Sequence, residues 1–146
     1  MKILLAFLVL TLASASFAQT LNCKAAIYDS AKNTKDYFDL IDELGVDDLS
    51  EAGITFEPTP VLSRTIKKQI EDDGKLWSDA ISLSGEGIDY AYNFTVSVEK
   101  NLITNVSIEN EMRHTGTNIS NKTGTKSIEA SSSDFDSYFD VSCTIE

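Results

Sequence analysis

The strongest constraint on the fold is an alternation of apolar and polar residues over residues 88–98. Successive side chains of a β-strand point to opposite faces, whereas a helix would scatter these apolar residues around its circumference. The stretch therefore predicts a strand with one buried face. That face carries Ile88, Tyr90, Tyr92, Phe94, Val96 and Val98.

A second alternating run covers residues 102–112, and the two runs together predict a hairpin. Pairing Val98 with Leu102 leaves the loop 99–101, which ends in Asn101, a residue type that tolerates the left-handed conformation. Burial of one face then fixes the register. The register places Phe94 opposite Val106 and Tyr92 opposite Ile108, with Leu102 and Met112 facing inward and Ile103 facing outward.

Two more strands are expected upstream of this hairpin. Residues 61–71 have apolar positions four apart, which suits a helix or a strand, but the Asp73-Gly74 pair that follows is typical of a tight hairpin turn. We therefore expect a strand that pairs with residues 75–83, and a turn at 84–87 that continues the meander. The pairing places Ile70 opposite Trp77, Lys68 opposite Asp79 and Ile66 opposite Ile81.

The remaining segments give weaker signals. Residues 21–28 alternate and predict a first strand, and residues 29–33 are polar and predict a break. Helical spacing follows over residues 34–44, with Thr34 as the N-cap and Gly45 at the C-terminal end. Residues 46–60 are expected to connect, and residues 114–124 to form a loop or a ragged sheet edge. A weak strand is expected around Ile128, and a last strand with Phe135, Phe139, Val141, Cys143 and Ile145 on its buried face.

Residues 1–18 have the pattern of a secretory signal peptide, because Lys2 precedes an apolar run and a small-residue cleavage site ends at Ala18. The remaining residues, 19–146, are expected to form one domain that is secreted or periplasmic. In an exported protein two cysteines most often form a disulfide, so we expect a Cys23–Cys143 bond that joins the first strand to the last. Two free thiols are the alternative.

The net charge of −11 argues against two classes of partner. A surface this acidic repels nucleic acid and anionic membranes at ordinary salt concentrations. Beyond residues 1–18, no segment is apolar enough to predict a membrane span. The sequence also lacks the motifs of phosphate, dinucleotide and zinc sites, so no cofactor or metal is expected.

Catalytic signals are sparse. The only histidine is His114, in a polar segment with no nucleophile motif around it. The spacing of Asp134, Asp136 and Asp140 admits a calcium site, but on a strand it is more simply a solvated outer face. We therefore expect no enzymatic activity.

One polar row interrupts the predicted buried face. The expected pairing places Lys68, Asp79 and Tyr92 side by side between two apolar rows. Charged groups inside a fold are costly unless they are paired, so the row predicts either an ion pair at a sheet margin or a contact with a ligand. These three residues are the candidate binding site.

The chain is thus predicted to be mainly β (α+β): a single curled antiparallel meander of about six or seven strands, either strongly twisted or closed toward a barrel, with one N-terminal helix. The favoured function is that of an exported, acidic, non-catalytic binding module for a small apolar ligand or a protein. A secreted inhibitor of a hydrolase is the alternative, and an enzyme based on carboxylates ranks third. An exposed rigid loop with a large apolar tip would favour inhibition, and a closed apolar cavity would favour a small ligand.

Overall fold

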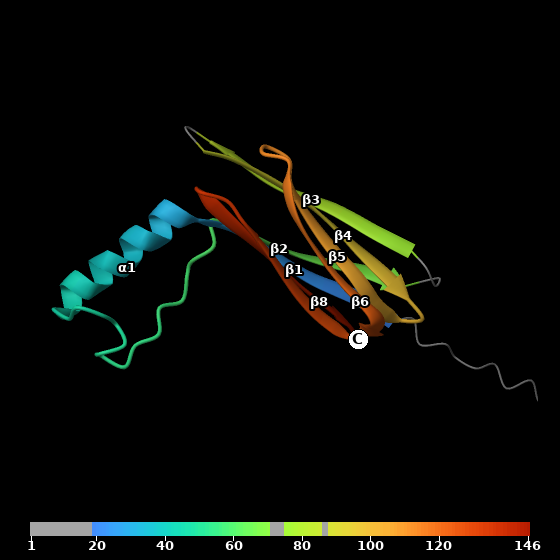
Figure 1. The fold of residues 1–146 in the computed structure, drawn as a ribbon, viewed down its shortest axis with the longest axis horizontal. Helices are drawn as coiled ribbons and strands as arrows, with labels where there is room; N and C mark the ends of the chain where they lie inside the picture. Colours follow the sequence, from blue (N-terminus) through green and yellow to red (C-terminus); the bar gives the residue numbers. More distant parts are fainter. Residues whose placement is uncertain (1–18, 71–74, 86–87) are drawn as a thin grey trace, which may run out of the picture.

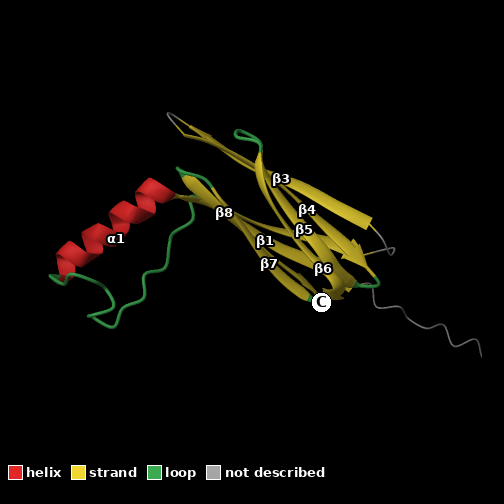
Figure 2. Ribbon diagram, viewed as in Figure 1, coloured by secondary structure: helices red, strands yellow, loops and turns green. Residues whose placement is uncertain are grey.

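The computed structural model describes the backbone of residues 19–70, 75–85 and 88–146 and the side chains of residues 19–70 and 90–146. The expected signal peptide and the Asp73-Gly74 turn lie outside these ranges. Strands predominate in these ranges, and one helix, α1, follows the first strand and precedes the second in the chain (Figure 2). The elements are β1 (Gln19–Asp29), α1 (Ser30–Leu44), β2 (Leu62–Ile70), β3 (Lys75–Gly85), β4 (Ile88–Glu99), β5 (Leu102–Asn110), β6 (Thr115–Thr125), β7 (Ser127–Ser133) and β8 (Ser137–Ile145).

The strands form two antiparallel sheets of four strands each, and the sheets lie one over the other (Figure 1). One sheet has the order β2-β1-β8-β7 and the other has the order β3-β4-β5-β6. The prediction of a mainly β fold with one helix is confirmed. The predicted single meander is wrong, because the chain passes from one sheet to the other between β2 and β3 and again between β6 and β7. The barrel alternative is not confirmed, since the described strands form two separate sheets.

The core lies between the two sheets and draws its apolar side chains from both. The predicted alternation of β4 is confirmed, since its described inward residues, from Tyr92 to Val98, are buried. They meet the inward face of β8, where the ring of Phe139 stacks on that of Tyr92 at a centroid distance of 4.9 Å. The other buried members include Leu21, Ala25, Ile27, Ile103, Val106, Ile108, Val141 and Ile145.

The β4–β5 hairpin has a different turn from the one expected. Its loop is Lys100-Asn101, with φ of 50° and 57°, and Glu99 pairs with Leu102. Positive φ at both loop residues is the geometry that matches the twist of paired strands. A bulge next to Val98 then turns Ile103 inward, where it is fully buried. The register is shifted by two residues, which places Phe94 opposite Ile108 and Tyr92 opposite Asn110 and keeps all four of these residues on the inward face. The predicted outward position of Ile103 is wrong.

The predicted pairing of residues 61–71 with residues 75–83 is wrong. The segment is a strand, as expected, but β2 pairs with β1 and places Ile66 opposite Cys23. The next strand, β3, pairs with β4 in the other sheet. Alternation indicates which face of a strand is buried, but it carries no information about which strand lies beside it.

The predicted disulfide is confirmed. Cys23 of β1 and Cys143 of β8 are directly opposite each other on neighbouring strands, with their Cα atoms 4.1 Å apart, and they are bonded. Both side chains are buried in the core. The bond therefore joins the first strand to the last, and β2, an edge strand, is the neighbour of β1 on its other side.

The helix ends at Leu44 with Gly45 as its C-cap, as predicted, but it begins at Ser30 and Thr34 is not its N-cap. Asp29 is the N-cap, because a carboxylate oxygen of this residue accepts a 2.7 Å hydrogen bond from the Lys32 amide. Asp is at least as good an N-cap as Thr, and in the first turn Lys32 is exposed while Asn33 is buried. In the described ranges, no helix is long and apolar enough to span a membrane.

The predictions also differ from the structure near the C-terminus. Of the two alternatives for the polar stretch, a loop or a ragged edge, the edge is confirmed, because the stretch is β6, an edge strand with a register shift against β5 and one half-buried apolar side chain, Ile119. The last strand begins at Ser137, so Phe135 precedes it and is exposed, whereas it was expected on the buried face. Met112 is likewise exposed in the turn after β5.

Candidate functional site

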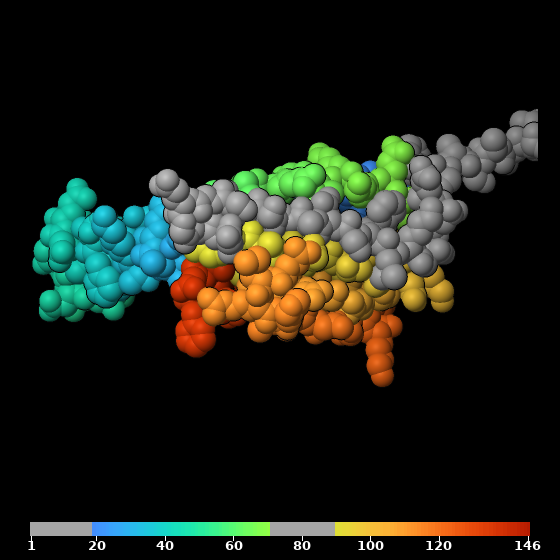
Figure 3. Space-filling view, turned by 90° about the horizontal axis from the view of Figure 1, so that it is seen from above, coloured from blue at the N-terminus to red at the C-terminus, as the bar shows by residue number. Residues whose placement is uncertain are grey.

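The exposed apolar side chains of the described residues gather at one end of the molecule. Phe135 is 90% exposed in the β7–β8 turn, and Met112 is 57% exposed in the β5–β6 turn. The other large exposed hydrophobics, Phe38, Leu44 and Ile54, belong to α1 and to the segment that follows it. This segment and α1 project together beyond the end of the two sheets (Figure 3). We call residues 30–60 the arm.

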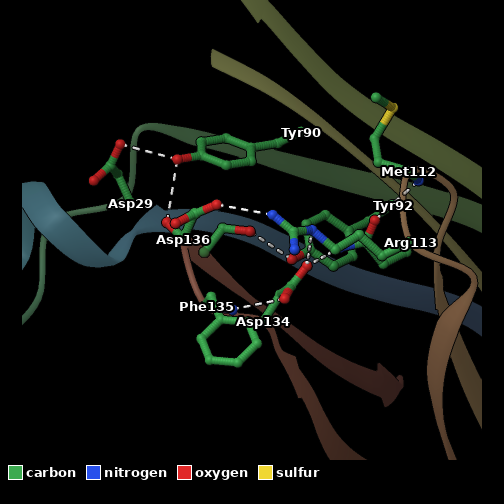
Figure 4. A network of polar contacts seen from close by, with 10 residues as sticks. Asp29, Tyr90, Tyr92, Met112, Arg113, Asp134, Phe135 and Asp136 are labelled. Carbon is green, nitrogen blue, oxygen red and sulfur yellow. Dashed lines mark hydrogen bonds and ion pairs between the residues drawn. The ribbon is translucent and has the colours of Figure 1, made fainter. Parts of the chain in front are cut away.

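The turn that carries Phe135, residues 134–136, is held by its own polar groups. The Asp134 amide donates a 2.7 Å hydrogen bond to the Ser137 carbonyl oxygen, and the Phe135 amide donates one of 2.7 Å to the Asp134 carboxylate. The carbonyl oxygen of Asp136 accepts bonds from the Tyr90 hydroxyl and from the Ser30 amide. The backbone of the turn is therefore fixed, while the Phe135 ring points away from the network (Figure 4). We call residues 134–136 the Phe135 turn.

Arg113 connects the Phe135 turn to the neighbouring β5–β6 turn. Its Nε lies 2.8 Å from the Asp134 carboxylate, and one of its terminal nitrogens lies 2.9 Å from the Asp136 carboxylate. The Asp134 carboxylate, which is 12% exposed, also accepts a 3.4 Å hydrogen bond from the Asn110 side chain. One guanidinium thus binds two carboxylates of one turn, a geometry to which its planar set of donors is suited.

The arm is joined to the same network through Asp29. One oxygen of this carboxylate caps α1, and the other accepts a 3.0 Å hydrogen bond from the Tyr90 hydroxyl. Partial burial and the neighbouring carboxylate of Asp29 raise the pKa of Tyr90 to about 12. Because the Ser30 amide also donates to the Asp136 carbonyl oxygen at 3.0 Å, the start of the helix and the Phe135 turn are hydrogen-bonded to each other.

The end of the molecule that carries the Phe135 turn is also hydrogen-bonded to the core. The Tyr92 hydroxyl and the Ser137 hydroxyl lie 2.7 Å apart and are both buried, at the point where β8 begins. Ser137 therefore contacts the Phe135 turn through its carbonyl oxygen and β4 through its side chain. The buried Tyr92–Ser137 hydrogen bond therefore joins the end of the Phe135 turn to the core.

The arm has its own small cluster of side chains. Leu49 is buried, and the Tyr37 ring meets Phe56 edge to face at 5.5 Å. Asn33, the buried residue of α1, donates to the Asp29 carbonyl oxygen and accepts a 2.8 Å bond from the Thr59 amide. These contacts hold the returning segment against the helix, so the arm projects as a folded unit.

The predicted polar row does not form across one sheet. Lys68 is exposed on β2 opposite Leu21, and Asp79 lies on β3 of the other sheet, opposite Phe94. Tyr92 is buried and bonded to Ser137, so it belongs to the core beneath the Phe135 turn. The ion pair between Lys68 and Asp79 stays a prediction, because the side chain of Asp79 is outside the described set.

The outer face of the sheet β2-β1-β8-β7 is hollowed. An open hollow of about 560 Å³, which extends to Ile119 of the other sheet, adjoins one of about 330 Å³, and both are lined by Asp140 and Ser142. Burial, followed by the nearby Glu129 carboxylate, raises the pKa of Asp140, although a hydrogen bond with Ser131 opposes the shift. The hollows are wide and open, unlike the enclosed apolar cavity expected for a small apolar ligand.

The acidic residues of the C-terminal segment have structural partners. Asp134 and Asp136 bind Arg113, and Asp140 lies apart from them on the outer face of β8. Within the described ranges, no three His, Cys, Asp or Glu side chains are grouped as a metal ion would require. His114 is exposed in the β5–β6 turn with φ of 52°.

Sequence reasoning missed the Phe135 turn because it continued the alternation of β8 backward through Phe135. The signal that could have found it was Asp134-Phe135-Asp136 itself, since aspartates that flank a residue before a strand are typical of a turn. Comparisons of this chain with family models, curated proteins and solved structures find no match. The function is therefore inferred from the geometry of the end of the molecule that carries Phe135.

Proposed function

We propose that this protein is an exported, non-catalytic binding module that attaches to a partner protein through the Phe135 turn. The observation that carries the proposal is the combination of a Phe135 ring that is 90% exposed with a backbone that is hydrogen-bonded on both sides of it. A single exposed apolar side chain is ordinary on a protein surface. A rigid turn that displays one is the form of a preorganised binding anchor.

The energetic argument concerns entropy. Binding orders side chains and loops at an interface, and this ordering opposes association. The Phe135 turn is already ordered by Arg113, Tyr90 and Ser137, so little further ordering is needed when the ring enters a pocket. Aromatic side chains that fill apolar pockets at the centre of an interface contribute a large part of its binding free energy.

A protein partner fits this end better than a small apolar ligand does. The apolar groups of the Phe135 turn and of the β5–β6 turn face outward at the tips of turns, where a complementary pocket has to come from another molecule. The buried Cys23–Cys143 bond is compatible with an extracellular or periplasmic location, and so is the leader pattern of residues 1–18.

Inhibition of a hydrolase is the second candidate. A rigid exposed loop with a large apolar tip is suited to enter an active-site cleft without changing shape, and complexes of preorganised partners show little movement of the backbone. The Phe135 turn has both properties. This alternative makes the partner an enzyme and makes Phe135 the residue that enters its cleft.

The test compares Phe135→Ser with a control, Lys122→Ser, which changes an exposed residue of β6. Each purified protein is immobilised and exposed to the exported proteins of its own host, and captured proteins are identified by mass spectrometry. We expect a partner that wild type and the control retain and that Phe135→Ser loses, with affinity at least about tenfold weaker. Identical capture and affinity for all three would refute the proposal.

The stability of both variants is measured in parallel. Because Phe135 is almost fully exposed, its replacement should change the free energy of unfolding by less than about 0.5 kcal/mol. The inhibitor alternative is tested on the same exported fraction by following its protease, glycosidase and esterase activities. Adding wild-type protein should lower one of these activities, and adding Phe135→Ser should not. If wild-type protein lowers none of them, inhibition of these three enzyme classes is excluded.

A further inference from the structure

We infer that the arm is a second contact site, and that it binds a positively charged protein surface that also offers an apolar contact to Phe38. The inference rests on the proposed function in one respect, namely that the surface belongs to the partner that binds the Phe135 turn. The charge of the arm and its exposed aromatic ring support it independently.

The arm carries most of the net charge of the protein. Residues 30–60 contain eight acidic and two basic residues, so more than half of the net charge of −11 lies in this projecting segment. Charge concentrated on a projection attracts an oppositely charged surface and speeds its association. The acidic residues are Asp36, Asp39, Asp42, Glu43, Asp47, Asp48, Glu51 and Glu57.

An apolar side chain stands among these charges. The arm cluster covers one face of α1, the face that contains Asn33 and Tyr37. Phe38 lies on another face and is 57% exposed, next to the exposed carboxylate of Asp39 and one turn before that of Asp42. An exposed aromatic ring with carboxylates beside it complements a surface where basic side chains surround an apolar site.

Both contact sites are held in a fixed relation. The cap residue Asp29 bonds to Tyr90, and the Ser30 amide bonds to Asp136 of the Phe135 turn, so the direction in which the arm leaves the sheets is set by that turn. Two sites joined by these hydrogen bonds favour a partner that engages both at once, because the second contact then forms within the same complex.

Charge also decides between the classes of occupant. A second copy of the chain would bring two acidic arms together, and like charges at an interface oppose association. Anionic membrane surfaces and nucleic acids would be repelled for the same reason. A protein with a basic surface is the occupant that the arm fits.

The experiment uses a defined probe with the full mature chain. The probe is a short amphipathic peptide made of leucine and lysine, and its leucine–glutamate counterpart is the charge control. Binding is followed by amide chemical shifts of isotopically labelled protein and by fluorescence anisotropy of the labelled peptide at several salt concentrations. We expect the lysine peptide to shift amides of the arm around Phe38, and the glutamate peptide to shift none.

Two triple variants separate the arm from the overall charge. Asp39→Asn/Asp42→Asn/Glu43→Gln removes three exposed charges from α1, and Glu99→Gln/Glu109→Gln/Glu129→Gln removes three from the sheets. The first variant should fold well, because carboxylates near the C-terminal end of a helix oppose its dipole. We expect it to weaken binding of the lysine peptide on the order of tenfold, and the sheet variant to weaken it by less than about twofold.

Each remaining outcome has one meaning. Equal losses in the two triple variants, or shifts spread over the sheets, would overturn the arm as a specific site. Phe38→Ser should weaken binding of the lysine peptide, whereas Phe135→Ser should leave it unchanged. Suppose that a partner is identified through Phe135 and binds the α1 triple variant as tightly as it binds wild type. This inference would then be wrong, while the proposed function would stand. Self-association of the protein at low salt would likewise contradict it.

Discussion

Replacing the two cysteines should remove a large part of the stability of the fold. The Cys23–Cys143 bond closes a loop between residues that are 120 apart in sequence. The chain-entropy model gives a stabilisation of about 5 kcal/mol for a loop of this length, and residual structure in the unfolded chain reduces that value. We expect a loss of roughly 3–5 kcal/mol, against a total of about 5–15 kcal/mol for a typical domain.

The assay is equilibrium unfolding in urea. Oxidised wild type, wild type reduced with dithiothreitol and Cys23→Ala/Cys143→Ala are compared under the same conditions. With a typical slope of about 1.5 kcal/mol per molar urea, the midpoint of the reduced protein should fall by about 2–3 M. Both cysteines are buried, so the alanine variant also leaves a cavity and should be the least stable of the three.

A packing control keeps the two effects apart. Cys23→Val/Cys143→Ala restores most of the lost volume without restoring the bond. It should therefore recover the cavity contribution and remain well below the oxidised protein. If oxidised and reduced wild type differed by less than about 1 kcal/mol, the reasoning from loop closure would be refuted.

Three further predictions concern the end of the molecule that carries Phe135 and the outer face of β8. Tyr92→Phe should cost about 1–2 kcal/mol, because it leaves the buried Ser137 hydroxyl without its partner, and adding Ser137→Ala should recover part of that loss; equal unfolding free energies for wild type and the single variant would count against it. Tyrosine absorbance should show one group with a pKa of about 12 that disappears in Tyr90→Phe and moves down in Asp29→Asn. Since this pKa lies above its ordinary value of 10.0, the associated stability is present below pH 10 and is lost as the pH rises to about 12, and a tyrosine titration complete by pH 11 would contradict the assignment. The pKa of Asp140 is also raised, so the folded state binds that proton more tightly than the unfolded chain does, and the free energy of unfolding should fall as the pH rises through the range between the two values. Asp140→Asn should flatten this dependence and be at least as stable as wild type at neutral pH, and a less stable variant would show that the carboxylate has a favourable role.

Much of the architecture could be predicted because burial imposes a period of two on a strand. The inward faces of β4 and β8 followed from alternation, and the Cys23–Cys143 bond followed from placing both cysteines on such faces. Neighbours across a sheet could not be predicted in the same way. An inward-facing apolar residue is satisfied by any core, so nothing in residues 61–71 distinguishes β1 from β3 as the partner of β2.

Local irregularities also could not be predicted from the alternation of apolar and polar residues. The bulge beside Val98 reverses the orientation of Ile103, and a strict alternation cannot contain it. The candidate site was missed for a related reason. Its anchor, Phe135, is exposed because Arg113 and Tyr90 hold the Phe135 turn from distant parts of the chain, and those contacts exist only in three dimensions.

The pairing of β1 with β8 has a mechanical consequence. Thr20 and Glu146 exchange two backbone hydrogen bonds near the two ends of the described chain, and the Cys23–Cys143 bond lies just inside them. Tension applied to these ends would pass through the disulfide, and residues 24–142 would carry none of it. A molecule pulled at Thr20 and Glu146 would lengthen only by the few residues between them and the bond. The Phe135 turn and the arm, which lie at the opposite end from the C-terminus (Figure 1), would keep their shape under load.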